Sequence, residues 1–592
     1  MRKLLYLFIA LSLLLPGLGI SQAAPVVTPT ISVDQIHPGQ RGVAYTVFQG
    51  IQPEAMDVEV LGVLRNANGP KGDIILVRLH GTKVEYTGVV AGMSGSPVYI
   101  EGKLAGALAF RIGEFSKEPI AGVTPISEMF EIKALDKSPE APIPASTQVA
   151  GASHTASPGE SPSAAGYTNY LRPIDTPLVF SGFSEDAVRL FSSEFASTGI
   201  VPVMGTGSVS GTKQPEPLVA GSAVSAVLVR GDMDIAATCT VTYADAEKLL
   251  ACGHPLLQFG NVDLPMSKAE VLATLPSPAN AFKIVNTTEP AGTFVQDRHT
   301  GILGVFNKEP KMVPVTLTIH GGATDKQVHY EVLNNARITP VAMMVTVFNA
   351  LHGLNEYGEE TTYRLTGRIE VNGYPDVALD NMYSPNDFGQ PAAIQLAMSV
   401  GDRFGRVFDN AFNATDVRGV HLDMELIRER RGVTLESVHT DVVEARPGDD
   451  LVVEAVLRPY RGERIVRRIP IHIPTSASKG LLHVLVSDGD TLDRMRRGPM
   501  LAGRKLDVAS TIAMLNREHK NDRLYVSLLQ SDPEAVVGDK IMPSLPLSVI
   551  NVMDPLRNSR DMVVFGESAV SEASAQLNYV VSGFEILNLI IK

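Results

Sequence analysis

The chain has 592 residues, 44% of them hydrophobic and 19% charged, with a formal net charge of −13. This length is more than one hydrophobic core supports, so we expect roughly three or four domains. The acidic balance and the lack of a basic run exclude nucleic acid as an expected partner. Gly and Pro are plentiful, Trp is absent and the alternating segments are short, which together predict a mostly β protein with some α.

Residues 1–23 have the pattern of a secretory signal peptide. Arg2 and Lys3 precede an apolar run that ends at Leu15, and Ala23 marks the expected cleavage site. The alternative is an uncleaved anchor, but the run is short for a membrane span. We expect an exported protein that is periplasmic, extracellular or associated with the cell envelope, with no stable membrane span after cleavage.

Residues 24–136 form the first expected domain after the signal peptide, with short strands separated by turns. The predicted elements are strands at 43–48, 56–65 and 73–79, a hairpin at 98–110, and a short amphipathic segment at 125–135. Between the third strand and the hairpin lies Gly92-Met93-Ser94-Gly95-Ser96-Pro97, which places a serine inside a glycine-rich turn.

This turn is the first candidate for chemistry. It leaves the backbone N–H groups of Gly92 and Ser94 free to point at one spot, and two such donors can hold the oxyanion of an acyl-transfer reaction. Serine peptidases of the chymotrypsin type have the same order of Gly-x-Ser-Gly, small residue, Pro, strand, turn and strand. Ser94 is therefore a candidate nucleophile, and the alternative is a serine that only satisfies its turn.

Residues 137–169 are rich in Pro, Ser and Ala and predict a flexible linker. The next expected domain, 170–335, begins with a helix capped by Ser184, followed by strands at 220–229, 235–243, 248–252 and 312–319. Cys239 and Cys252 lie opposite each other on a predicted hairpin. They form either a disulfide, which an oxidising compartment would allow, or two buried free thiols.

The hairpin is followed at once by Gly253-His254-Pro255. The proline ends the strand and the glycine lets the backbone turn, so we expect the imidazole at the rim of the sheet. Histidine accepts and returns a proton near neutral pH, which makes His254 the candidate base for Ser94.

Three further regions complete the predicted organisation. Residues 336–431 form a helical or mixed segment with helices at 339–353 and 392–412, residues 432–476 a β-sandwich-like module, and residues 477–592 an α+β module with a helix capped by Asp507.

Both motifs resemble the peptidase domain of the SpoIVB (stage IV sporulation protein B) family. The resemblance is carried by 92–97 with the Glu101-Gly102-Lys103 turn, by 239–255, and by the later segment 297–304. It covers roughly 35–135 and 215–325, and implies a chymotrypsin-like double β-barrel that cleaves a protein or peptide substrate with Ser94 and His254.

The chain departs from that family in two ways. The serine half precedes the histidine half here, so the two halves are swapped in order. Leu79 stands at the position that matches the acid of the family, and the nearest replacements in the sequence are Asp73, Glu85 and Asp263. His80 and His299 are alternative bases, although exposed loop histidines are the simpler interpretation, and no regulatory PDZ domain is apparent.

The leading hypothesis is an exported serine endopeptidase. The alternative is a catalytically inactive exported binding or assembly protein that keeps the double barrel as a scaffold, an alternative motivated by the missing acid. Neither His-Glu-x-x-His nor Cys-x-x-Cys occurs, so the sequence supports no metal site and indicates no cofactor. The sequence does not fix the oligomeric state.

Overall fold

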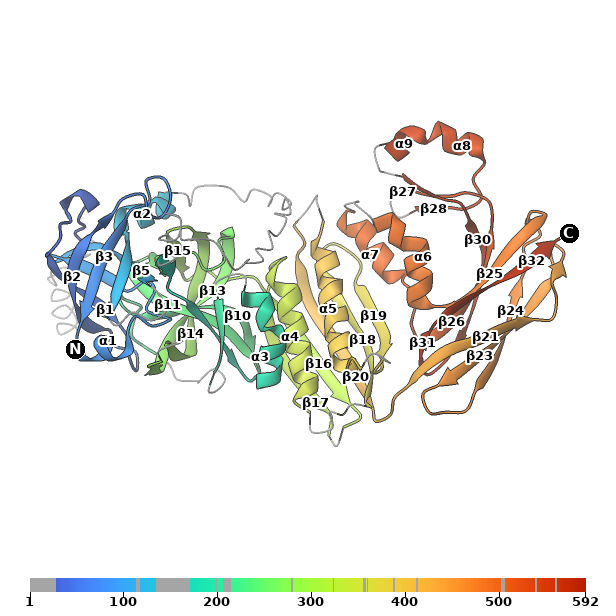
Figure 1. The fold of residues 1–592 in the computed structure, drawn as a ribbon, viewed down its shortest axis with the longest axis horizontal. Coiled ribbons are helices and arrows are strands. Elements are labelled where there is room, and N and C mark those ends of the chain that lie inside the picture. The colour runs from blue at the N-terminus through green and yellow to red at the C-terminus, as the bar shows by residue number, and fades with distance from the viewer. Residues whose placement is uncertain are drawn as a thin grey trace, which may run out of the picture.

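The computed structural model describes residues 28–112, 118–134, 171–196, 200–205, 214–277, 281–322, 324–354, 358, 360–386, 389–410, 414–501, 506–537, 540–558 and 562–592. The predicted signal peptide (1–23) and linker (137–169) lie outside these residues. The described elements follow one another along the long axis, from an N-terminal pair of barrels to a C-terminal pair of sheets (Figure 1).

The first barrel is a closed ring of six antiparallel strands. They are β1 (Arg41–Thr46), β2 (Glu54–Leu64), β3 (Ile74–His80), β4 (Pro97–Ile100), β5 (Lys103–Ile112) and β6 (Ile120–Pro125). The ring runs β1-β2-β3-β6-β5-β4 and closes through the pairing of β4 with β1. Two short helices, α1 (Thr82–Thr87) and α2 (Ile126–Ala134), follow β3 and β6. Alternating side chains fill the interior, as expected for a small barrel.

The second barrel repeats this arrangement. Its strands are β10 (Ala223–Gly231), β11 (Asp234–Ala244), β12 (Lys248–Ala251), β13 (Gly260–Leu275), β14 (Phe282–Arg298) and β15 (Gly301–Phe306). The ring runs β10-β11-β12-β15-β14-β13 and closes through the pairing of β13 with β10. If the six strands of each barrel are numbered 1 to 6 along the chain, both rings have the same strand order, 1-2-3-6-5-4.

A connecting region links the two barrels. It contains β7 (Leu171–Pro173), which pairs with β5, then β8 (Thr176–Ser181), α3 (Glu185–Ala196) and β9 (Ile200–Met204). Because β8 pairs with β11, this region crosses from the first barrel to the second within a few residues.

The sheet of the second barrel continues into the middle of the chain. Strands β16 (Met312–His320), β17 (Lys326–Leu333), β18 (Thr362–Val371), β19 (Val377–Tyr383) and β20 (Val417–Ile427) extend it, and α4 (Ile338–His352) and α5 (Ala392–Phe408) pack together beside it. Since β16 pairs with β20 in parallel, the predicted boundary between 335 and 336 runs through one continuous sheet.

Two further sheets form a C-terminal sandwich. One contains β21 (Gly432–Thr440), β23 (Asp450–Pro459), β24 (Ile465–His472) and β31 (Val580–Ser582); the other contains β22 (Glu444–Ala445), β25 (Gly480–Asp488), β26 (Arg523–Gln530), β30 (Ser568–Gln576) and β32 (Phe584–Ile591). One apolar cluster joins both sheets, so the sandwich draws strands from both predicted C-terminal modules.

Smaller elements flank this sandwich. They are α6 (Gly489–Leu501), α7 (Val508–Asn516), α8 (Leu547–Val552), α9 (Asp554–Asn558), and a small sheet of β27 (Glu534–Val537), β28 (Lys540–Met542) and β29 (Met562–Phe565). Asp507 caps α7 by accepting a hydrogen bond from the Ser510 amide, as its position in the sequence predicts. The predicted fold class, a double β-barrel followed by further β and α+β modules, is confirmed.

Candidate active site

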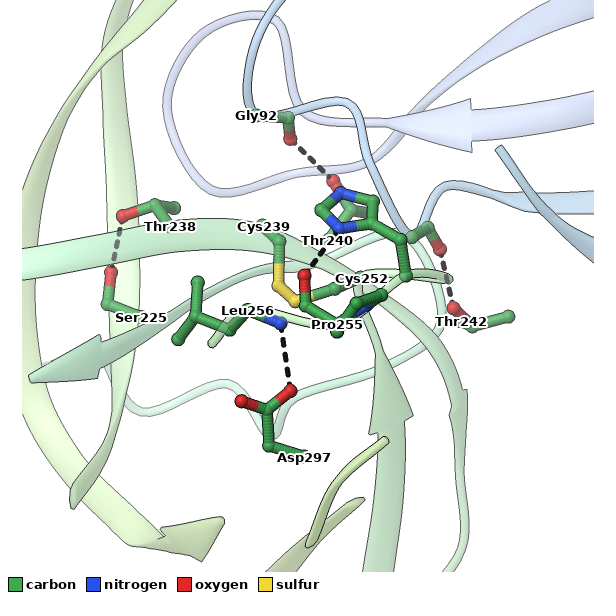
Figure 2. The surroundings of a disulfide bond; sticks show 12 residues. Gly92, Ser225, Thr238, Cys239, Thr240, Thr242, Cys252, Pro255, Leu256 and Asp297 are labelled. Atoms are coloured by element: carbon green, nitrogen blue, oxygen red, sulfur yellow. Dashed lines mark hydrogen bonds between the residues drawn. A yellow bond between two sulfur atoms is a disulfide. The ribbon is translucent and has the colours of Figure 1, made fainter. Parts of the chain in front are cut away.

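The serine turn, residues 92–97, lies where the two barrels meet. Strand β11 of the second barrel holds three of its carbonyl oxygens: the Thr240 amide donates to Ser94 O (2.8 Å), Thr240 Oγ1 to Gly92 O (3.0 Å) and Thr242 Oγ1 to Gly95 O (2.8 Å). Figure 2 shows the bond from Thr240 to Gly92. Gly95 has φ +94°, and a Cβ there would lie 1.9 Å from the Thr240 carbonyl oxygen, so only glycine fits.

Other backbone groups of the turn also have partners. Met93 O accepts from both the amide (3.0 Å) and the hydroxyl (2.7 Å) of Ser96, and the Gly95 amide donates to Leu108 O (2.7 Å). Among the described residues, the amides of Gly92 and Ser94 have no acceptor in the protein. These are the two donors that the sequence predicts for an oxyanion hole.

His254 follows β12, so it lies on the connection from the third to the fourth strand of the second barrel. Ser94 lies on the same connection of the first barrel, which makes the two positions equivalent. The neighbouring glycines of the two residues approach Leu108: its carbonyl oxygen accepts from the Gly95 amide and lies 3.4 Å from the point where a Cβ of Gly253 would be. The structure thus brings the two predicted motifs to one seam.

Ser94 is fully buried and His254 is only 5% exposed. Within the part of the chain that the structure describes, neither Ser94 Oγ nor His254 Nε2 has a hydrogen-bond partner, so the two are not bonded to each other. Buried polar atoms without partners are costly and rare in native proteins. Here two of them lie on equivalent loops at one seam.

The orientation of His254 is set by the backbone. Its Nδ1 lies 2.8 Å from the carbonyl oxygen of Pro255. Because a carbonyl oxygen only accepts, Nδ1 carries the proton and Nε2 keeps its lone pair. Burial lowers the pKa of His254 below 6.5, although the backbones of Pro255 and Ile174 act in the opposite direction. The imidazole is therefore neutral near pH 7 and can act as a base.

The loop that carries His254 is fixed on both sides. Cys239 and Cys252 form a disulfide between β11 and the residue after β12 (Figure 2). Beyond the histidine, the buried carboxylate of Asp297 accepts from the amides of Leu256 (2.8 Å) and Leu257 (2.7 Å). Burial raises the pKa of Asp297, and the amides of this loop lower it. Asp297 thus anchors the loop, a role that the sequence did not reveal.

The three acid candidates have other partners. Asp73 forms an ion pair with Arg65 (2.7 Å), Glu85 accepts from the Gly81 amide (3.2 Å), and Asp263 forms an ion pair with Lys308 (3.1 Å). No hydrogen bond joins any of them to His254 among the described residues. Leu79, at the position expected for the acid, is buried in the core of the first barrel. The partner of Nδ1 is a carbonyl group and not a carboxylate.

The alternative bases also lie in other surroundings. His80 contacts Glu59 (3.3 Å) at the end of β3, and His299 contacts the carbonyl oxygen of Asn68 (3.2 Å) on the surface. Neither has a contact with Ser94 among the described residues.

Lys283 is a residue of this seam that the sequence reasoning missed. It is fully buried at the start of β14, its amide donates to Ala91 O (3.1 Å), and its Nζ donates to Thr46 Oγ1 (2.7 Å). Its side chain lies under Gly92, with Cδ 3.2 Å from the point where a Cβ of that glycine would be. Burial lowers the pKa of Lys283 to about 7. The period-two pattern that buries Lys283 with Val285 and Thr287 was the available signal.

The described residues give no indication of a metal site or of a membrane-spanning helix. They contain no group of three or more His, Cys, Asp or Glu side chains placed to bind a metal ion. None of their helices has both the length and the apolar character needed to cross a bilayer.

Two barrels of identical strand order, with a serine turn and a histidine loop on equivalent connections at their seam, define a chymotrypsin-like fold. Residues 21–123 match the family model described as SpoIVB peptidase S55, which confirms the resemblance seen in the motifs. The matched segment contains the serine turn, whereas His254 lies beyond it. No curated protein and no solved structure matches the chain.

Proposed function

We propose that the protein is an exported serine endopeptidase of the SpoIVB type. The observation that supports this proposal is that four groups on two loops at one seam have no hydrogen-bond partner among the described residues: Ser94 Oγ, His254 Nε2, and the amides of Gly92 and Ser94. The family match over the serine half supports a hydrolase with protein substrates. Export is part of the proposal because the disulfide suits an oxidising compartment.

The reaction follows from the roles of these groups. Ser94 Oγ attacks the carbonyl carbon of a peptide bond while His254 Nε2 accepts the hydroxyl proton. The amides of Gly92 and Ser94 hold the oxyanion of the tetrahedral intermediate. His254 then returns its proton to the leaving amine, and a water molecule hydrolyses the acyl-enzyme by the same steps. The Pro255 carbonyl keeps Nδ1 protonated throughout.

A fluorophosphonate probe tests this proposal, because it reacts with activated serines. We expect adduct formation at Ser94, found by mass spectrometry of tryptic peptides, to be lost in Ser94→Ala and in His254→Gln. Ser225→Ala is the matched control, since Ser225 is a buried serine of the second barrel that bonds Thr238 and not the serine turn. Incubation over hours allows for the burial of Ser94. Labelling that survives Ser94→Ala, or folded wild-type protein that never labels, would overturn the proposal.

One observation favours the second candidate function, a non-catalytic binding scaffold. Ser94 Oγ and His254 Nε2 are not bonded to each other, and Nδ1 has a carbonyl partner where a carboxylate was expected. A scaffold of this kind would keep its fold and never label at Ser94, so the same experiment separates the two functions.

A further inference from the structure

A short segment of the chain lies on the edge of β5 beside the serine turn. Residues 171–175, here called the cover segment, contain β7, whose Leu171, Arg172 and Pro173 pair with Ile112, Arg111 and Phe110 of β5. The other edge of β5 is taken by β6. The cover segment therefore occupies the edge along which β4 pairs, beyond Pro97, the first residue of β4.

The register places this segment next to the serine turn along β5. The serine turn bonds β5 at Leu108, through the Gly95 amide to Leu108 O (2.7 Å) and the Leu108 amide to Ser96 O (2.9 Å). One residue further along β5, the Ile174 amide donates to Ala109 O (2.8 Å). Consecutive residues of β5 thus bond the serine turn, at Leu108, and the cover segment, at Ala109.

Ile174 closes the seam. It is 1% exposed and belongs to the same apolar cluster as Met93 and Leu108, while its backbone interacts with the His254 imidazole. Ser94 is fully buried in this arrangement. Ile174 is thus a buried residue that lies next to the serine turn along β5 and next to the His254 imidazole.

The pairing of the cover segment with β5 is short. It is three residues long, and Pro173 has no amide to donate to the ladder. Asp175 adds an ion pair with Arg111 (2.7 Å), in which both side chains are about one-fifth exposed. Partly exposed ion pairs are weak, so a competing strand could replace these contacts.

We propose that residues 109–112 of β5 form the edge on which an extended peptide substrate pairs, and that the cover segment occupies this edge as a built-in competitor. The preferred substrate presents an aliphatic side chain at the place of Ile174. This inference rests on the proposed peptidase function for its chemistry. The apparent affinity for a peptide is then the intrinsic affinity multiplied by the fraction of molecules in which the edge is free.

Peptide binding tests the inference without catalysis. The probe is a fluorescein-labelled peptide, Leu-Arg-Pro-Ile-Asp, that copies residues 171–175, and its binding to the full chain carrying Ser94→Ala is followed by anisotropy. Adding Asp175→Asn should tighten binding up to about fivefold. Adding Ile174→Ala as well should tighten it by at least about tenfold. Glu331→Gln, which breaks the Arg230–Glu331 ion pair on β10 and β17, is the matched control and should change nothing.

The outcomes are distinct for the two proposals. Equal affinity in all backgrounds, or equal binding of a peptide with Asp in place of Ile, overturns the proposed edge and its cover. Asp175 is partly exposed and asparagine has nearly the same size, so Asp175→Asn keeps the test valid if Ile174→Ala does not fold. Tighter peptide binding without Ser94 labelling in any variant supports the edge and refutes the peptidase. If Ser94 is labelled at the same rate in wild type and in Asp175→Asn, and the peptide affinity is unchanged, the peptidase proposal is supported and the proposed edge and its cover are refuted.

Discussion

Lys283→Met tests how much the burial of the Lys283 side chain costs in folding free energy. Lys283 is fully buried, and its Nζ donates to the hydroxyl of Thr46. Desolvation is the only cause acting on its pKa, which falls from 10.5 to about 7. Methionine has a similar length and no charge, so it fills the same space under Gly92.

The sign and size follow from proton linkage. Between about pH 7 and 10.5 the folded protein binds fewer protons at Lys283 than the unfolded chain does, so the free energy of unfolding rises with pH across this window and falls as pH drops through it. Relative to high pH, the burial penalty is about 4 kcal/mol at pH 7 and about 2 kcal/mol at pH 9. Lys283→Met removes this penalty but takes away the bond to the buried Thr46 hydroxyl, which costs about 1–3 kcal/mol. The variant should therefore be more stable than wild type at pH 7, with an advantage that shrinks by about 2 kcal/mol at pH 9.

The chain has no Trp, so one introduced tryptophan reports on the barrels alone. Phe306→Trp, at a partly exposed position of β15, serves as the background for urea unfolding at pH 7, 8 and 9. Lys308→Met is the matched control, because Lys308 is a surface lysine in an ion pair with Asp263. An advantage of Lys283→Met that does not vary with pH, or a variant less stable than wild type at pH 7, would refute the reasoning.

Two further predictions concern the supports of the seam. Thr240→Val removes the hydroxyl that bonds Gly92 O; we expect a loss of about 1–3 kcal/mol and slower Ser94 labelling. Its control is Thr238→Val on the same strand, β11, which loses a bond to Ser225 of β10 and should destabilise without a comparable effect on labelling. Replacing both Cys239 and Cys252 by serine should cost about 3 kcal/mol for a loop of this length, measured by urea unfolding with Phe306→Trp; unchanged stability would contradict it.

The sequence contained the local parts of this fold but not their long-range assembly. The hairpins, the cap at Asp507 and the two motifs could be recognised because turn residues, alternation and capping act within a few positions. The closure of each barrel depends on pairings such as β13 with β10, which lie far apart in the chain. The return of β31 to pair with β21 is a further case, and it joins two segments that looked like separate modules.

The same distinction applies to the site. Ser94 and His254 stood out because each lies in a short motif with glycine and proline. Lys283 and Asp297 did not, since their importance comes from contacts with Thr46 and with the Leu256 amide across the fold. A charged residue on the buried face of an alternating strand is the signal that could have pointed to Lys283.

The carbonyl group of Pro255 can replace one of the two effects of the expected acid on His254, but not the other. A triad carboxylate selects the tautomer with Nε2 unprotonated and stabilises the imidazolium that forms during attack. The Pro255 carbonyl supplies the first effect through its bond to Nδ1, but it carries no charge for the second. Burial opposes the imidazolium further by lowering the pKa of His254. A peptidase built this way has a competent base that holds its proton weakly, so we expect slow turnover.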